Sequence, residues 1–237
     1  MLDRVFVPRF LVAVLVASLT SCVAPPRPET SPTAPEPAAP TDAAAATIFE
    51  IVSADISVQV YRAGPLAELG HNHVIASTGL VGRIELREPL SASTLKLALP
   101  LGTLTVDEPA RRAAAGEGFP DSLTESDRDG TRRNMLGPAL LDAGRFPVLE
   151  LTSLKVEGDA GRLTIRCRVN VAGGGGELLV PVMVSTNGDE LAAHGTFTAT
   201  HGELGLAPFS AAMGALRVRD DMRISYQLVA RRADDAV

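Results

Sequence analysis

Apolar and polar residues alternate along much of the chain after residue 46. The clearest run extends from Leu163 to Val171, where the odd positions are apolar and the even positions are polar. Similar alternation occurs in 95–101 and in 224–230. A period of two places successive side chains on opposite faces, so these runs predict β-strands with one face toward a core.

Short segments rich in Gly, Asn and Asp separate the alternating runs. They are 158–161, 173–176 and 187–189. Strands joined by such tight turns pair in antiparallel fashion, and about eight of them predict a barrel or a sandwich. We expect an all-β domain over 47–232, folded as an antiparallel barrel of about eight strands. Such a barrel is filled by its side chains or holds one small apolar ligand.

Several places depart from simple alternation. The parity of apolar positions changes at 152–153, which predicts a β-bulge. Helices are expected at 110–115 and 123–136, with one more helical turn at 137–141, so short helices lie between strands. A turn or kink is expected near Asp55. The strand at 178–184 is apolar on both faces and contains Pro181, which predicts an edge-like or lipid-facing strand.

The N-terminal segment has the features of an export signal. Arg4 and Arg9 form a positively charged region before an apolar run, 10–17, that is too short to span a bilayer. Leu19-Thr20-Ser21-Cys22 resembles a bacterial lipobox. We expect residues 1–21 to be a lipoprotein signal peptide and Cys22 to carry acyl chains, which include palmitate. The alternative is a plain secretory peptide with an incidental cysteine.

The segment 22–46 is rich in Pro and Ala and lacks apolar periodicity, so we expect a disordered tether. Residues 233–237 are expected to be a short tail. An acylated Cys22 would anchor the domain in the bacterial cell envelope, on the periplasmic side. Because Val23 rather than Asp follows Cys22, a sorting rule favours the outer membrane over the inner one.

Composition excludes some functions. The net charge of −6 and the 4% aromatic content argue against a nucleic-acid partner. With Cys22 acylated, Cys167 has no partner for a disulfide, and its parity predicts a small buried hydrophobe. No nucleophile elbow or His-Glu-x-x-His motif is present, so we do not expect an enzyme.

The order of motifs over 47–232 resembles the YceI family of lipocalin-like, lipid- or polyisoprenoid-binding periplasmic domains. The segments that carry the resemblance are 62–79, 132–153, 161–182 and 203–224. His201 and Leu204 depart from the Asp and Phe usual there. The resemblance implies a barrel around an apolar tunnel that holds a long isoprenoid or another long-chain lipid. Storage or transport of that lipid is the expected function, with no cofactor. The sequence leaves the oligomeric state open, a homodimer included.

Candidate ligand-binding residues come from three segments. His71 and His73 would share one face of an extended segment, and Arg132 and Arg133 are bidentate donors suited to a diphosphate head group. The inward positions of one strand would contact the tail: Leu163, Ile165, Cys167 and Val169. One alternative is a periplasmic metal site that uses His71 and His73, with His194 or His201 as a further ligand. Another is a ligand-free envelope stress protein. For His71 and His73, hydrogen bonding at the barrel mouth is the competing interpretation, and for the arginines it is a solvated helix face.

Overall fold

The computed structural model describes residues 46–120, 122–159 and 161–233. Its contacts divide the chain into two units, 1–42 and 43–237, and every described residue belongs to the second unit. The predicted signal peptide, Cys22, nearly all of the tether and most of the tail therefore lie outside the described residues.

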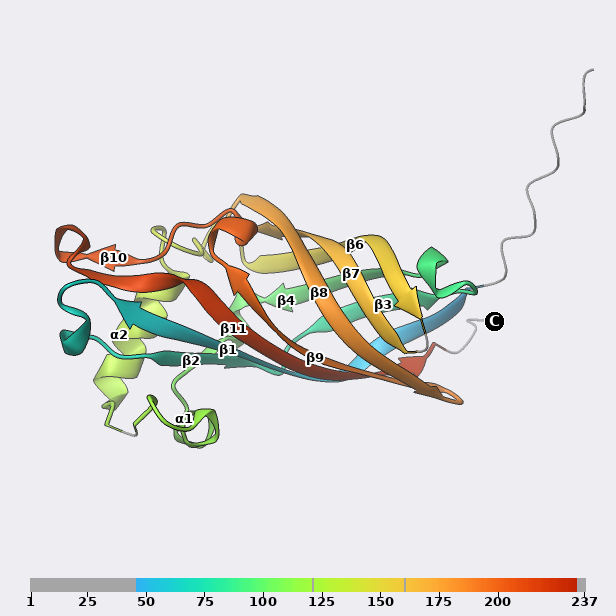
Figure 1. Cartoon of the computed structure of the whole chain (residues 1–237), viewed down its shortest axis with the longest axis horizontal. Helices are drawn as coiled ribbons and strands as arrows, with labels where there is room; N and C mark the ends of the chain where they lie inside the picture. The colour runs from blue at the N-terminus through green and yellow to red at the C-terminus, as the bar shows by residue number, and fades with distance from the viewer. Residues whose placement is uncertain (1–45, 121, 160, 234–237) are drawn as a thin grey trace, which may run out of the picture. The chain divides into compact units, whose positions relative to one another are not determined.

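Eight strands of the described residues close into an antiparallel barrel (Figure 1). They are β1 (Thr47–Ala63), β3 (Val81–Leu86), β4 (Thr94–Pro100), β6 (Val148–Asp159), β7 (Arg162–Val171), β8 (Gly174–Asn187), β9 (Glu190–Thr200) and β11 (Leu216–Arg232). Their order around the barrel is β1-β3-β4-β6-β7-β8-β9-β11, and pairing of β11 with β1 closes it. The predicted all-β barrel with short helices between strands is confirmed.

Short elements complete one end of the barrel. The first four residues of β1 pair with β3, whereas its stretch 56–60 pairs with β2 (His73–Ser77), so two strands share one edge of β1. Next to β2 lies β5 (Thr105–Val106), and β10 (Ser210–Ala211) pairs with the start of β11. The helices α1 (Pro109–Ala115) and α2 (Glu125–Leu136) contact β2 and β5 respectively. Both predicted helices are therefore confirmed.

The helix boundaries have local causes. Pro109 occupies the first turn of α1, where a missing N–H costs nothing, and Gly116 ends the helix with a positive φ of 80°. Thr124 caps α2 in a reciprocal pair with Asp127, a capping box. The stretch 137–141 forms turns rather than the extra helical turn that we expected.

Of the finer strand predictions, the bulge is confirmed and two others are wrong. In β7, buried and exposed residues alternate without exception, and the register between β6 and β7 shifts between Ser153 and Lys155, which confirms the bulge. No turn occurs near Asp55, because β1 runs continuously with a register shift at 51–53. β8 is not an edge strand, since it pairs with β7 and β9. The ladder with β9 starts only at Met183, so Pro181 does not interrupt it.

The barrel interior consists of two apolar clusters. One, which we call the filled half, has buried residues from the first half of β1, from β6, β7 and β8, from the start of β9 and from the end of β11: Phe49, Ala54, Val156, Leu163, Ile165, Cys167, Val182, Leu191, Ala193, Leu228 and Ala230. The other, the cavity half, has buried residues from the ends of β4, β7 and β9, the first halves of β8 and β11, and the loops near β5 and α2: Leu99, Leu101, Leu104, Leu141, Val169, Val171, Leu178, Ala199 and Met222.

Candidate binding site

A cavity of about 250 Å³ lies in the cavity half. Strands β1, β2, β4 and β11, helix α2 and the loops around β10 supply its walls. The apolar lining residues are Val58, Val60, Ile75, Leu99, Leu101, Leu104, Met135, Leu140, Leu141, Leu149, Leu204, Leu206, Phe209, Val218 and Met222. An engineered cavity of about 150 Å³ accepts benzene, so this one has room for about ten carbon atoms. Its size and lining suit a small apolar ligand or one end of a longer one.

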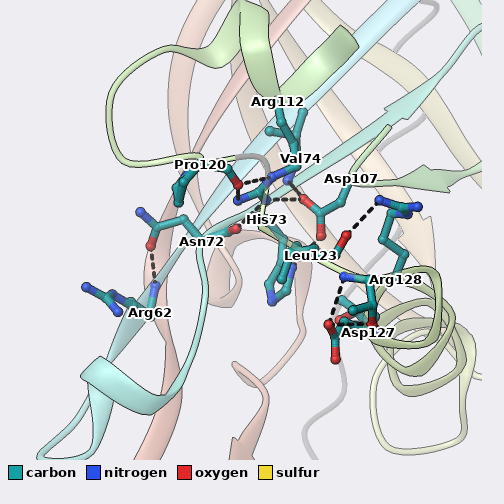
Figure 2. A network of polar contacts seen from close by, with 12 residues as sticks. Arg62, Asn72, His73, Val74, Asp107, Arg112, Pro120, Leu123, Asp127 and Arg128 are labelled. Carbon is teal, nitrogen blue, oxygen red and sulfur yellow. Dashed lines mark hydrogen bonds and ion pairs between the residues drawn. The ribbon is translucent and has the colours of Figure 1, made fainter. Parts of the chain in front are cut away.

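His73 brings a polar group into this apolar wall. It starts β2, opposite Val60 of β1, and its ring lines the cavity. Its Nδ1 lies 2.6 Å from Oδ2 of Asp107, and Figure 2 shows this contact at the centre of a polar network. The other oxygen of Asp107, Oδ1, accepts hydrogen bonds from the backbone N–H of Val74 at 2.9 Å and from Nη1 of Arg112 at 2.6 Å.

Arg112 balances the charge of Asp107 in the interior. Both side chains have no exposed surface, and the arginine is satisfied by further acceptors. Its Nη1 donates to the backbone carbonyl of Asn72 at 2.8 Å, while Nε and Nη2 donate to that of Pro120 at 3.0 and 2.7 Å. The Phe119 ring lies 5.9 Å from the guanidinium carbon. A buried ion pair persists in this way only when its remaining donors and acceptors are paired as well.

Asn72 connects this network to the barrel wall (Figure 2). Its Oδ1 accepts a hydrogen bond from the backbone N–H of Arg62, in β1, at 3.0 Å. Its Nδ2 donates to the carbonyl of Gly118, in the loop after α1, at 2.9 Å. The network therefore ties β1, β2, β5 and α1 together beside the cavity.

The ionisation of Asp107 decides that Nδ1 of His73 carries a hydrogen. Burial alone raises the pKa of the Asp107 carboxyl, but hydrogen bonds from His73, Val74 and Arg112 outweigh it, and its pKa is lowered below the ordinary 3.8. The carboxylate is therefore ionised at neutral pH and can only accept. It follows that Nδ1 of His73 carries a hydrogen and donates it to Asp107.

A second histidine lines the same cavity. His201 follows β9, and its side chain is buried. Its Nδ1 lies 2.8 Å from the backbone carbonyl oxygen of Asp220. Because a carbonyl oxygen accepts and never donates, Nδ1 of His201 also carries the hydrogen.

The predicted polar residues lie in different places. His73 lines the cavity, whereas His71 lies outside its lining, with its ring centroid 6.4 Å from that of His73. Arg132 donates to the backbone carbonyls of Leu104 and Gly102 at 3.1 and 3.0 Å, so it ties α2 to the loop before β5. Arg133 is exposed on α2. Neither arginine is among the residues that line the cavity.

The four predicted residues of β7 are buried but lie away from the cavity lining. Leu163, Ile165 and Cys167 belong to the filled half, and Val169 to the core of the cavity half. Burial raises the pKa of the Cys167 thiol to about 12, which keeps it protonated. Cys167 is thus the small buried hydrophobe that its parity predicted.

Two further features bear on function. Among the residues that the structure describes, no cluster of three or more His, Cys, Asp or Glu side chains has the arrangement of a metal site. In the same part of the chain, no helix combines the length and apolarity needed to cross a membrane.

Sequence reasoning missed Asp107 and Arg112. Asp107 and Glu108 precede the helix expected at 110–115, and Glu108 is the N-cap residue of α1. Asp107 instead has a positive φ of 55° and points into the protein. The only signal in the sequence was a second acidic residue before Pro109, which does not distinguish a cap from a buried partner of a distant histidine.

Known proteins resemble this chain in structure only. No protein-family profile and no curated protein matches the sequence. BcnA of Burkholderia cenocepacia has a TM-score of 0.52 and 12% identity, over 74% of this chain and 95% of its own. A polyisoprenoid binding domain from Saccharophagus degradans, implicated in plant cell wall breakdown, has a TM-score of 0.50 and 10% identity, over 78% and 98%.

A YceI protein from Campylobacter jejuni has a TM-score of 0.46 and 11% identity, over 65% of this chain and 82% of its own. At 12% and 10% identity, the structural similarity to BcnA and to the polyisoprenoid binding domain establishes the fold and nothing finer. The described barrel therefore shares its fold with BcnA and with a polyisoprenoid binding domain, which is the fold that the expected resemblance to the YceI family implies.

Proposed function

We propose that this chain binds an apolar lipid of isoprenoid type in the cavity half of its barrel, for storage or transport in the bacterial cell envelope. The observation that carries the proposal is the cavity of about 250 Å³ with Leu, Val, Ile, Met and Phe side chains over most of its wall. The structural similarity to a domain described as polyisoprenoid-binding supports the choice of lipid class.

The hydrophobic effect is sufficient for this function. Each buried CH₂ contributes about 0.8 kcal/mol, so about ten carbons contribute roughly 8 kcal/mol before the costs of association. That corresponds to a dissociation constant of about 1 µM at best. A longer isoprenoid needs further room, because the filled half is occupied by its own side chains. We therefore propose that one end of the lipid occupies the cavity.

The test is to block the cavity. Val60 lines it from β1, whereas Val52 lies on the same strand and is 55% exposed. The full chain and its Val60→Phe and Val52→Phe variants are purified from bacterial cells, and organic extracts are analysed by mass spectrometry. We expect a stoichiometric isoprenoid in wild type and in Val52→Phe, and its loss in Val60→Phe. An extract without lipid, or one that the Val60→Phe change does not alter, would contradict the proposal and favour a ligand-free envelope protein.

We further propose that the acylated Cys22 anchors the chain in the envelope, in the outer membrane. The support is the Leu19–Cys22 motif after the apolar run. Two or more acyl chains give stable membrane binding, where one gives marginal binding. Cys22→Ser should move the protein from the membrane fraction to the soluble fraction of cells. Unchanged fractionation would exclude the anchor while leaving lipid binding in the barrel intact.

A further inference from the structure

The polar groups of the cavity wall carry information about the head group of the ligand. Four polar residues interrupt the apolar lining, namely His73, Thr131, Asn134 and His201, and the lining includes no Lys, Arg, Asp or Glu. A diphosphate or a carboxylate in this cavity would be a buried charge without an opposite charge beside it, which is strongly unfavourable. The wall therefore favours a neutral head group.

His73 presents a hydrogen-bond acceptor to this space. Its Nδ1–H donates to the ionised Asp107, whose charge Arg112 already balances. In a neutral imidazole that carries its hydrogen on Nδ1, Nε2 has a lone pair and accepts. Nε2 of His73 has no hydrogen-bond partner among the residues that the structure describes.

Two more lining residues present acceptors to the cavity, because each uses a hydrogen in a bond to a backbone carbonyl. Nδ1–H of His201 donates to the carbonyl of Asp220, which leaves its Nε2 as an acceptor. The Thr131 hydroxyl donates to the carbonyl of Asp127 at 3.0 Å, which leaves the lone pairs of its oxygen. Of the polar lining residues, Asn134 alone offers N–H groups, and it is exposed on α2.

From this set of acceptors we infer that the polar end of the ligand is a hydroxyl group that donates its hydrogen bond to Nε2 of His73, so that the ligand is an apolar alcohol. A hydroxyl is neutral, which suits a lining without charges, and it is a donor, which suits a wall of acceptors. The inference rests on the proposed function and makes it more specific. It also excludes the diphosphate that Arg132 and Arg133 suggested from the sequence, since both arginines lie outside the lining.

The test compares probes that share one hydrocarbon skeleton of about ten carbons, the capacity of the cavity. They are geraniol, geranic acid, geranyl diphosphate and the parent hydrocarbon, each titrated at neutral pH by calorimetry into the full chain freed of co-purified lipid. One hydrogen bond contributes about 1 kcal/mol net, so geraniol should bind about five-fold more tightly than the hydrocarbon. The acid and the diphosphate should bind more weakly than the hydrocarbon.

A pair of variants assigns the effect to one ring. His73→Leu should abolish the advantage of geraniol while hydrocarbon binding persists. His71→Leu, at the neighbouring histidine outside the lining, should keep the advantage. Should His73→Leu not fold, ¹⁵N NMR of the wild-type chain gives the same information, because the Nε2 resonance of His73 must shift when geraniol is added and stay in place with the hydrocarbon.

The outcomes separate this inference from the proposed function. Hydrocarbon binding with no advantage for geraniol, or tighter binding of the acid or diphosphate, would overturn the hydroxyl assignment and leave apolar ligand binding in place. Failure of every probe to bind would overturn both. An advantage of geraniol that survives His73→Leu, or an unmoved Nε2 resonance, would remove His73 from the assignment.

Discussion

Asp107 shows how a single residue can be both buried and charged. It has no exposed surface, yet three donors on His73, Val74 and Arg112 surround its carboxylate. The donors are an imidazole, a backbone N–H and a guanidinium, and together they lower the pKa of the Asp107 carboxyl although burial alone would raise it. The stability of this corner of the barrel should therefore depend on every member of the set.

Arg112→Met should strongly destabilise the fold, because it leaves a buried carboxylate without its counter-charge. Breaking a buried pair in this way costs about 3–5 kcal/mol of the free energy of unfolding. The neighbouring Arg111 pairs with Asp55 at 2.7 Å on a partly exposed surface, so Arg111→Met should cost no more than about 1 kcal/mol. Urea unfolding of the two variants measures both values, and equal losses would contradict a special role for the buried pair.

Asp107→Asn should be less stable than wild type at neutral pH, and the difference should narrow in acid. The pKa of Asp107 is lower in the folded chain than its ordinary 3.8. Its contribution is therefore fully present above 3.8 and is lost as pH falls through the lower, folded value. Urea unfolding of both proteins at a series of pH values measures this. A difference that stayed constant well below pH 3.8 would show that the folded pKa is not lowered.

At the scale of elements, the glycine run at the start of β8 controls how closely a loop approaches the barrel. A Cβ on Gly176 would lie 2.1 Å from the backbone carbonyl oxygen of Glu203, whereas one on Gly174 would meet only the carbonyl of Val171 at 4.0 Å. Glu203 belongs to the 3₁₀ turn Gly202–Leu204, which lies between two lining residues, His201 and Leu206. Glycine at 176 thus lets that turn pack against β8 and complete the cavity wall.

Gly176→Ala should consequently destabilise the chain by about 1–3 kcal/mol, the usual cost of forcing extra atoms into a packed site. It should also weaken binding of the hydrocarbon probe, because the turn that carries part of the lining has to move. Gly174→Ala is the matched control and should leave binding unchanged. Thermal unfolding and calorimetry measure the two effects, and equal behaviour of the variants would contradict this account of the run.

The elements themselves could largely be predicted from the sequence. Period-two alternation located β7, and the change of parity near Ser153 located the bulge, because both signals depend only on which face each residue takes. The prediction of an edge-like strand from Pro181 was wrong, because β9 pairs with β8 only beyond the proline. Asp107 could not have been found, because its partner His73 is 34 positions distant and the contact depends on the closed barrel.

At the scale of the whole domain, alternation predicts which side chains face inward but not whether they meet there. Leu163, Ile165 and Cys167 face inward as predicted, and they meet the opposite wall in the filled half. Val58 and Val60 also face inward, and a cavity separates them from their neighbours. Whether inward residues fill the space or enclose it depends on distances across the barrel, which the local pattern does not contain.

The reactivity of the Cys167 thiol tests whether the filled half stays closed, because this residue lies there with 1% of its surface exposed. Its pKa of about 12 and its burial should keep it unreactive toward a thiol reagent at pH 8 in a Cys22→Ser background. Labelling should appear only when urea unfolds the chain, and an isoprenoid that occupies the cavity alone should not accelerate it. Faster labelling on addition of the lipid would show that the filled half opens to admit a tail.

The network around Arg112 has a consequence for the timing of recognition. Its hydrogen bonds join β1, β2, β5 and α1 without any contribution from a ligand, so His73 is oriented in the empty protein. The conformational entropy of the His73 side chain is therefore lost on folding and not on ligand binding. The rates of ligand association and dissociation should consequently be set by the passage of the hydrocarbon chain into and out of the barrel, because the His73 imidazole keeps one orientation throughout.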